Sequence, residues 1–425
     1  MTMRWPAYCL AITSLFSMNA AASNDDLDIF GFLSVGVAGM DKQDVTIGEF
    51  DGKGNFKQDT LFALQVSKQV NETTSATGQL ISRGADDFDT KTAWAFVTYQ
   101  PNQDRAIRMG RLRIPFFSYS EFLEVGYAYN WVRPPIDVYS ITFSSFDGVD
   151  LTQNFSVGAL DGSIQLNYGR FTDDLNIFDE EYASELDNVA GVSLDFYAGN
   201  WGFRLGAQQT EMTLDSKTDE ATMAALQAFL EAGAKAQAGD LAAAATIPDL
   251  QAAFEEKRAE LVNLRRIDQA QTGAKIIALT DASISADTAD DFVFDGHKAN
   301  FYNAALTYDN GSFSFVTEFA GLQYESGLLV DNRAWLASAA QRFGDTTVHL
   351  TYSTSRDVLD SGEGGKLQKA LNLQGEDKSV TLGFRYDYDV NTALKLEAQH
   401  HDELVNRGVE GDQAILYSVA VDVIF

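Results

Sequence analysis

Arginines and carboxylates between residues 83 and 137 are the side chains most able to act on a solute. Arg111 and Arg113 stand two residues apart, a spacing that places both side chains on one face of a β-strand. Glu121 and Glu124 follow in the next segment and carry the opposite charge. Fixed charges of opposite sign facing each other across a gap create a field that orients polar solutes and sets ion preference. The set predicted to form this site is Arg83, Arg111, Arg113, Glu121, Glu124, Arg133 and Asp137.

The arginines also admit a purely structural role. Arg111 and Arg113 could pair with the carboxylates that follow and only hold that segment in place. The two roles are compatible, because an ion pair that fixes a segment also fixes the charges on its edge. Both therefore stay open at the level of the sequence.

Composition excludes several classes of chemistry. Cys9 is the only cysteine and there are 4 histidines, too few for a thiol-based or zinc site, so we expect no metal and no cofactor. A formal net charge of -30 argues against a nucleic-acid partner, which requires a basic face. The chain has no run of 18 apolar residues, which excludes a transmembrane helix.

Residues 1–22 have the pattern of a secretory signal peptide. Arg4 supplies a positive charge, residues 7–16 are apolar, and Ala20, Ala21 and Ala22 offer a cleavage site. Cys9 lies in this segment, so we expect the mature chain, 23–425, to contain no cysteine. It is expected to work outside the cytoplasm without a disulfide.

Most of the mature chain alternates between apolar and polar side chains with a period of two residues. Val380, Leu382 and Phe384 alternate with Thr381 and Gly383, and the pattern recurs along the chain. Sixteen strands are predicted, beginning near Leu27, Thr60, Ser75, Thr90, Arg105, Gly148, Gly162, Asn188, Trp201, Ala299, Ser312, Arg333, Thr346, Lys378, Thr392 and Ala414.

The predicted links between these strands alternate in length. Short turns are predicted at Asn71-Glu72, Pro101-Asn102, Asp161-Gly162, Gly199-Asn200, Asp309-Asn310-Gly311, Gly344-Asp345 and Val390-Asn391. Long links are predicted at 40–57, 115–146, 172–187, 214–297 and 358–377. Short turns at one end and long loops at the other are typical of an all-β, transmembrane antiparallel β-barrel. Such a sheet must close, because an open edge would leave backbone groups unpaired in lipid.

Residues 214–297 differ from the rest of the chain. This segment is rich in Ala, Glu, Lys and Gln, and its apolar residues recur at helical spacing on either side of Pro248. We interpret it as a helical insert in a long extracellular loop, with helices at about 219–238 and 248–268. It could cap the barrel, shield a subunit contact or enter the lumen, and the sequence does not choose among these.

The carboxyl-terminal strand carries the most specific signal. The chain ends at Phe425, and Tyr417 and the valines between them fall on the same face of the strand. A terminal strand that is apolar on one face and ends in Phe resembles the assembly signal of bacterial outer-membrane barrel proteins. Tyr417 and Phe425 are therefore the predicted assembly residues.

The segment Gly110-Arg111-Leu112-Arg113-Ile114-Pro115-Phe116 ends the predicted fifth strand, and the third long link, 115–146, follows it. This arrangement resembles the general diffusion porin family of Gram-negative outer membranes, in which the third long loop folds into the pore. The acidic-glycine motif common at the tip of that loop is absent here. The loop is rich in aromatic residues instead, so we expect it to fold onto a surface.

The resemblance implies a 16-stranded, trimeric porin that lets ions and small hydrophilic solutes diffuse passively. It implies a homotrimer in the cell outer membrane, surrounded by membrane lipid and lipopolysaccharide, with 115–146 as the pore-constricting loop. Strand alternation predicts further pore-lining charges at Asp195, Arg204, Glu318, Arg342, Arg385 and Glu397.

Two other functions remain as alternatives. A structural or adhesive outer-membrane barrel would use the helical insert as its contact element. An enzyme barrel similar to an outer-membrane phospholipase would need a serine–histidine pair on the outer wall. His400 has the outward parity there, but no serine partner is evident, so we expect the chain not to be an enzyme.

Overall fold

The computed structural model describes residues 27–425 except 43–44, 46, 48–49, 51, 142, 178–179, 216–234, 236–295, 326, 328, 407–408 and 411. The predicted signal peptide 1–22, with Cys9, lies outside these residues. So do the two predicted helices of the insert, with the exception of Lys235.

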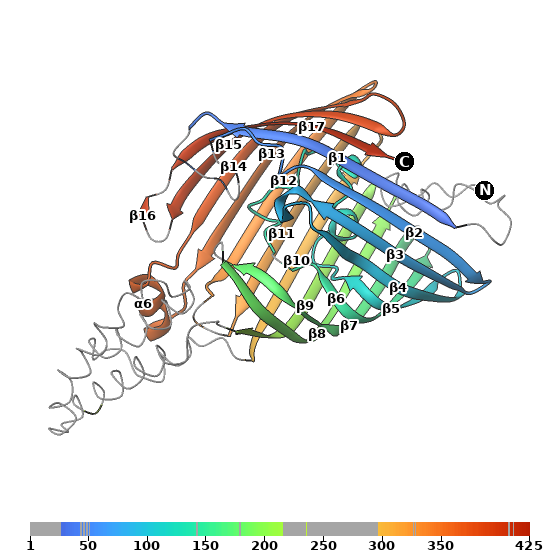
Figure 1. Cartoon of the computed structure of the whole chain (residues 1–425), viewed down its shortest axis with the longest axis horizontal. Coiled ribbons are helices and arrows are strands. Elements are labelled where there is room, and N and C mark those ends of the chain that lie inside the picture. Colours follow the sequence, from blue (N-terminus) through green and yellow to red (C-terminus); the bar gives the residue numbers. More distant parts are fainter. Residues whose placement is uncertain are drawn as a thin grey trace.

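The described residues form one antiparallel sheet that closes on itself as a barrel (Figure 1). Its strands are β1 (Asp28–Met40), β2 (Leu61–Asn71), β3 (Thr74–Arg83), β4 (Thr90–Asn102), β5 (Arg105–Arg113), β6 (Ser145–Val157), β7 (Leu160–Ile177), β8 (Glu180–Ala198), β9 (Trp201–Asp215), β10 (His297–Asp309), β11 (Phe313–Tyr324), β12 (Asp331–Phe343), β13 (Thr346–Val358), β14 (Glu376–Asp387), β15 (Thr392–Asn406), β16 (Val409–Glu410) and β17 (Gln413–Ile424). Closure comes from pairing of β1 with β17, which sets Phe32 opposite Ile424. Since β16 has only two residues, sixteen long strands make up the wall, and the predicted 16-stranded barrel is confirmed.

The eighth strand begins earlier than the sequence indicated. β8 starts at Glu180 rather than near Asn188, and β7 continues to Ile177, so the predicted loop 172–187 is mostly a paired hairpin. Backbone groups pair whether or not the side chains alternate. Alternation of side chains therefore reveals only the part of a strand that has an apolar face. It does not reveal the polar ends of β7 and β8 that extend beyond that part.

Two predicted turns are displaced. Pro101 belongs to the last residues of β4, at an irregularity between Tyr99 and Asn102 where proline removes no regular ladder bond. The turn before β7 lies at residues 158–159, ahead of the predicted Asp161-Gly162. Gly158 has a φ of 65°, in the left-handed region that glycine adopts at low cost and that tight hairpins require.

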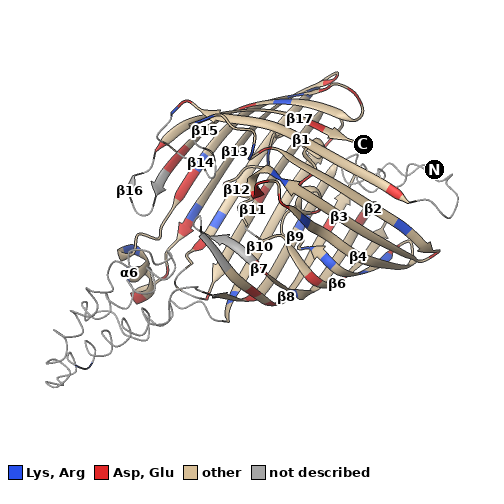
Figure 2. Ribbon diagram, viewed as in Figure 1, with Lys and Arg blue, Asp and Glu red and all other residues tan. Residues whose placement is uncertain are grey.

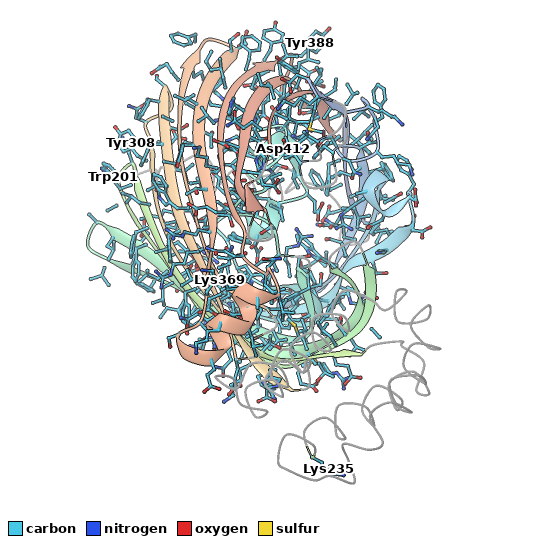
Figure 3. All side chains as sticks on the ribbon, turned by 90° about the vertical axis from the view of Figure 1, so that its left-hand side faces the viewer. Trp201, Lys235, Tyr308, Lys369, Tyr388 and Asp412 are labelled. Atoms are coloured by element: carbon cyan, nitrogen blue, oxygen red, sulfur yellow. The ribbon has the colours of Figure 1, made fainter. Side chains whose placement is uncertain are left out.

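The two faces of the wall differ in polarity as the alternation predicted. On β14, Leu382 is exposed on the outside, whereas Thr381 and Arg385 are buried on the inside. Large aromatic residues project from the outer surface near the short turns, including Trp201, Tyr308 and Tyr388 (Figure 3). Charged residues of both signs lie along the wall strands (Figure 2).

The carboxyl-terminal residue is held in the closing seam. The backbone N–H of Phe425 donates to the carbonyl of Gly31 at 2.9 Å, and the N–H of Gly31 donates back at 2.7 Å. The ring of Phe425 stacks with that of Phe62 at 6.4 Å between centroids. Tyr417 is also exposed on the outer face. The assembly role of Tyr417 and Phe425 stays a prediction.

One α-helix of the described residues was not anticipated. α6 (Gly362–Ala370) lies in the link between β13 and β14, with Leu367 fully buried. A nine-residue helix without a clear apolar stripe leaves little periodic signal in the sequence. In the part of the chain that the structure describes, no helix is long and apolar enough to span a membrane.

Candidate functional site

The link between β5 and β6 crosses the interior of the barrel. We call residues 114–144 the inner loop; the predicted constriction loop, 115–146, is almost the same segment. The indole Nε1 of Trp131 donates to Thr351 Oγ1 on β13 at 2.8 Å, and the amide of Val132 donates to Glu397 on β15 at 2.9 Å. The inner loop therefore reaches the wall opposite the strands from which it leaves.

Aromatic side chains of the inner loop pack against one another and against the wall. The rings of Phe117 and Tyr139 pack at a tilt, with centroids 4.4 Å apart, and Phe116 meets Phe301 of β10 edge-on at 4.8 Å. These rings belong to a buried hydrophobic cluster that includes Trp131. The loop folds onto a surface, as its aromatic content indicated.

Lys395 of β15 is a major attachment of the inner loop. Its Nζ donates to the carbonyls of Gly126 and Trp131, both at 2.6 Å, and pairs with Asp422 at 2.8 Å. The side chain is 0 % exposed. Arg385 of β14 acts in the same way, donating to two further loop carbonyls at 2.8 Å. Lys395 was absent from the predicted site, and Arg385, predicted to line the pore, is buried against the loop.

Two predicted lining residues of the short-turn half form local pairs. Arg204 donates to Asp195 at 2.9 Å and also to the carbonyl of Pro115 at 2.9 Å, so it too holds the inner loop. Arg342 lies nearer the rim and reaches Asp387 at 3.4 Å. Of these residues, Arg342 keeps the greatest exposure to solvent.

Carboxylates of the wall accept hydrogen bonds from the inner loop. Glu318 accepts from the amide of Ser118 at 2.8 Å and from Asn303 Nδ2 at 3.0 Å, and it is 0 % exposed. Glu397 accepts from Val132 and is likewise buried. Both side chains point inward as their parity predicted, yet the loop covers them. They are therefore attachment points of the loop rather than open lining of a passage.

Arg133 and Asp137, predicted for the constriction, lie on the attached side of the inner loop. Arg133 pairs with Asp59 through two hydrogen bonds and donates to Ser418 Oγ at 2.8 Å. Asp137 accepts from Ser353 Oγ at 2.5 Å. These contacts tie the second half of the loop to β13, β17 and the segment before β2.

The edge of the inner loop that faces β3 and β5 carries the two carboxylates predicted to lie opposite arginines of the wall. Glu124 accepts from Arg83 at 2.7 and 3.2 Å and from Arg113 at 3.3 Å. Glu121 pairs with Arg108 of β5 at 2.9 Å. The structure thus brings together Arg83, Arg113, Glu121 and Glu124 of the predicted set. We call these four residues with Arg108 the charged edge.

The carboxylates of the charged edge are ionised at neutral pH. Burial would raise the pKa of Glu124, but the positive charges of Arg83 and Arg113 outweigh this and lower it to about 2. The pKa of Glu121 is lowered chiefly by the charge of Arg108. Both carboxylates therefore keep their negative charge across the physiological range.

Arg111 faces away from the site, which corrects its predicted inward direction. It makes two hydrogen bonds of 2.9 Å to Asp147 of β6, on the same outer face as Met109 and Val149, which are 61 % and 37 % exposed. Alternation along β5 continues from Met109 to Arg111. Arg113 faces inward because it stands at the last position of the strand, where the chain turns into the inner loop.

Arg108 is the charged-edge residue that the sequence analysis missed. Its guanidinium bonds to both Glu121 and Asp150 and lies on the inner face of β5. The apolar neighbours Ile107 and Met109 could have revealed it, because they mark the outward parity of the strand.

Inner-facing side chains differ in exposure around the barrel. On β13 to β15 they are buried behind the inner loop, as with His349, Thr381 and Gln399. On β3 to β6 several keep partial exposure, including Thr77 and Thr98. The more exposed part of the inner wall therefore lies on the β3–β6 side of the inner loop, beside the charged edge.

A cavity of about 140 Å³ lies on the short-turn side of the inner loop. Tyr119, Phe122 and Tyr129 line it from the loop, and Arg204 and Ser338 line it from the wall. Among the described residues, no three histidine, cysteine, aspartate or glutamate side chains are grouped so as to hold a metal ion.

The fold has counterparts among solved outer-membrane proteins. A trimer form of OmpT from Vibrio cholerae is similar with a TM-score of 0.53 and 10% identity, over 94% of this chain and 99% of that one. OmpF of Salmonella typhi, in complex with daunomycin, gives 0.54 and 13%, over 94% and 97%. An anion-selective porin from Comamonas acidovorans gives 0.51 and 10%, over 94% and 99%. Neither a protein-family profile nor a curated protein matches the sequence. At these identities the likeness shows the fold, which is that of the outer-membrane porins.

Proposed function

We propose that this chain is an outer-membrane porin that lets ions and small hydrophilic solutes diffuse passively across the membrane. The observation that carries the proposal is the inner loop, held across a closed barrel with a charged edge on its open side. Opposed fixed charges beside a passage orient polar solutes and bias ion entry. A loop that only filled the barrel would not need an ionised, partly exposed edge.

The outer surface supports placement in a bilayer. Leu350, Leu382 and Leu396 are exposed on neighbouring strands, and such apolar area on a closed wall is expected to face lipid. Aromatic residues near the short turns, such as Trp201 and Tyr388, fit the interfacial girdle of such barrels. We further propose a homotrimer in contact with outer-membrane lipid and lipopolysaccharide, since the similar OmpT structure is a trimer form.

A diffusion channel needs no catalytic group, and we propose that this protein is not an enzyme. Ser379 Oγ does lie 2.9 Å from His401 Nδ1, with Asp137 3.7 Å from the same nitrogen. Ser379 is buried inside the wall, however, and a nucleophilic serine must be reachable by its substrate. The contact is better explained as part of the packing behind the inner loop.

Conductance of the purified protein in a planar lipid bilayer tests the proposal. We expect discrete steps that grow with salt concentration. Thr98→Trp places a bulky ring on the exposed inner side of β4 and should reduce the step. Val97→Trp, its matched control, places the same ring on the outer face and should leave the step unchanged. No steps from folded wild-type protein would refute the channel. Equal steps from both variants would show that the passage does not run along the inner side of β4.

A further inference from the structure

Three charged residues stand side by side on the outer face of the barrel. The strand registers set Arg111 opposite Asp147 and Asp147 opposite Arg170, across β5, β6 and β7. We call these three residues the outer cluster. Charge on a lipid-facing surface is costly at the middle of the bilayer and tolerated near its interfaces. The position of the outer cluster therefore needs an explanation.

The outer cluster lies where the apolar surface of β7 ends. Ile164, Leu166 and Tyr168 are exposed on the outer face below Arg170, and the next outward residue beyond it is Thr172. This change from apolar to polar residues marks the boundary of the hydrocarbon region on the long-loop side. The inference rests on the proposed function, because it takes that side to face the outer leaflet.

The two guanidinium groups retain capacity for an anion. Asp147 occupies two N–H groups of Arg111, while Arg170, in the described part of the chain, donates one side-chain hydrogen bond, to Thr172 Oγ1 at 3.1 Å. Asp147 is the carboxylate between the two guanidinium groups. The negative charge of Asp173, which lies beyond the hydrocarbon boundary, attracts Arg111 more weakly than Asp147 does. Arginine forks match the oxygens of phosphate, the principal anion at a membrane interface.

A groove on the outer wall begins at the outer cluster and continues below it. The small residues Ala95, Gly110 and Gly148 line it, and the paired side chains of Met109 and Val149 stand one position below the two glycines. Arg111 and Asp147 stand at its upper end. A largely apolar groove that ends at the outer cluster, with two guanidinium groups around one carboxylate, fits an acyl chain joined to an anionic headgroup, and a free anion would leave the groove unused.

We propose that Arg111 and Arg170 bind a headgroup phosphate of an outer-leaflet lipid, a phosphorylated glycolipid of the lipid A type, with an acyl chain in the groove between β4 and β6. The outer cluster then fixes lipid at one sector of the barrel, on the far side of the wall from the charged edge.

Native mass spectrometry of the detergent-solubilised full chain measures this binding directly. Lipid A with both phosphates is titrated beside the dephosphorylated lipid and beside inorganic phosphate alone. Two charge-assisted contacts should make the phosphorylated lipid bind roughly tenfold or more tightly than the dephosphorylated one. Arg111→Gln with Arg170→Gln should remove that preference. Arg105→Gln, on the same strand but at the opposite rim, should retain it.

Several results would overturn the proposal. They are equal binding of both lipids, unchanged preference in the double variant, or inorganic phosphate displacing the lipid at comparable concentration. A double variant that dissociates into monomers would mark a subunit contact instead. If the double variant does not fold, Arg170→Gln alone, which breaks only the bond to Thr172, replaces it. Conductance separates the two proposals: the double variant should conduct normally, and wild type without conductance would refute the channel and not the lipid site.

Discussion

Replacing Glu124 with glutamine tests the charged edge most directly. Glu124 is the shared partner of Arg83 and Arg113, and its side chain is 17 % exposed, whereas that of Arg113 is 4 % exposed. Glutamine keeps the shape and one acceptor oxygen but removes the charge. The change therefore leaves the buried Arg113 without its paired carboxylate, whereas Arg83 keeps Asp86 at 3.4 Å.

The cost to stability follows from the pKa of Glu124. The folded value of about 2 lies below the ordinary 4.5, and this difference corresponds to about 3 kcal/mol of stability. Because the folded pKa is the lower one, the contribution is complete above pH 4.5 and is lost as the pH falls toward 2. We expect Glu124→Gln to lose stability of that order at pH 7, and to differ little from wild type near pH 2.

The charge itself should change ion preference. A unit charge about 5 Å from a passing ion contributes about 0.8 kcal/mol in water, or roughly a fourfold change in local ion concentration before screening by salt. The reversal potential in a salt gradient should therefore move toward anions by an amount equivalent to about a twofold to fourfold change in the permeability ratio.

Glu121→Gln provides the matched control. Glu121 also faces an arginine, but its side chain is 45 % exposed and its partner Arg108 keeps Asp150, so the loss of stability should stay below about 1 kcal/mol. Thermal unfolding at pH 7 and the reversal potential are measured for both variants. If Glu124→Gln were no less stable than Glu121→Gln, or moved selectivity toward cations, the assignment of the charged edge would be wrong.

Three further predictions concern the loop and its charges. Lys395→Met should destabilise the barrel by about 3–5 kcal/mol and raise current noise, because it leaves the buried Asp422 without its cationic partner and, among the described residues, with only the hydroxyl of Ser34. Lys378→Met removes a half-exposed cation and should cost less than about 1 kcal/mol in thermal unfolding. Arg83→Ser combined with Arg108→Ser should shift the reversal potential toward cations, because both arginines belong to the charged edge. Arg111→Ser should cause no shift, since Arg111 lies on the outer face, and a shift in this variant would contradict that placement. Acidification of wild type from pH 4.5 toward 2 should loosen the loop edge as Glu124 protonates, seen as rising current noise that Glu124→Gln shows already at pH 7.

The wall was largely predictable from the sequence, because alternation is a local property. Strands such as β13, β14 and β15 have a single apolar face, so their register and direction follow from side-chain parity. Counted from Ile107 and Met109, the same rule places Arg111 outward, so its predicted inward direction came from a wrong assignment of parity. The rule does not give the direction of Arg113, since no residue within the motif shows where β5 ends and the inner loop begins. Arg111 and Arg113 share parity, and only the turn of the chain after β5 separates their directions.

The attachments of the inner loop were not predictable in this way. Lys395 contacts Gly126 across a sequence separation of 269 residues, and Glu318 contacts Ser118 across 200. Parity shows that the side chain of a wall residue points inward, but it does not show whether that side chain meets solvent or the loop. Only the path of the loop decides, and it depends on packing of Phe116, Trp131 and their neighbours.

Many charged residues of the wall point inward, but most of those described above bind the inner loop and do not face the passage. The need to attach the loop explains this. A loop that crosses a barrel leaves the β-ladder, and each of its buried amides and carbonyls must find another partner. Lys395, Arg385 and Arg204 supply donors to loop carbonyls, and Glu318 and Glu397 accept from loop amides. Because these bonds go to the backbone, they depend little on the identity of the loop side chains. The charges of the charged edge can therefore change without detaching the rest of the loop. Since many inward charges are used for attachment, a count of inward charges from the sequence overstates the field in the passage.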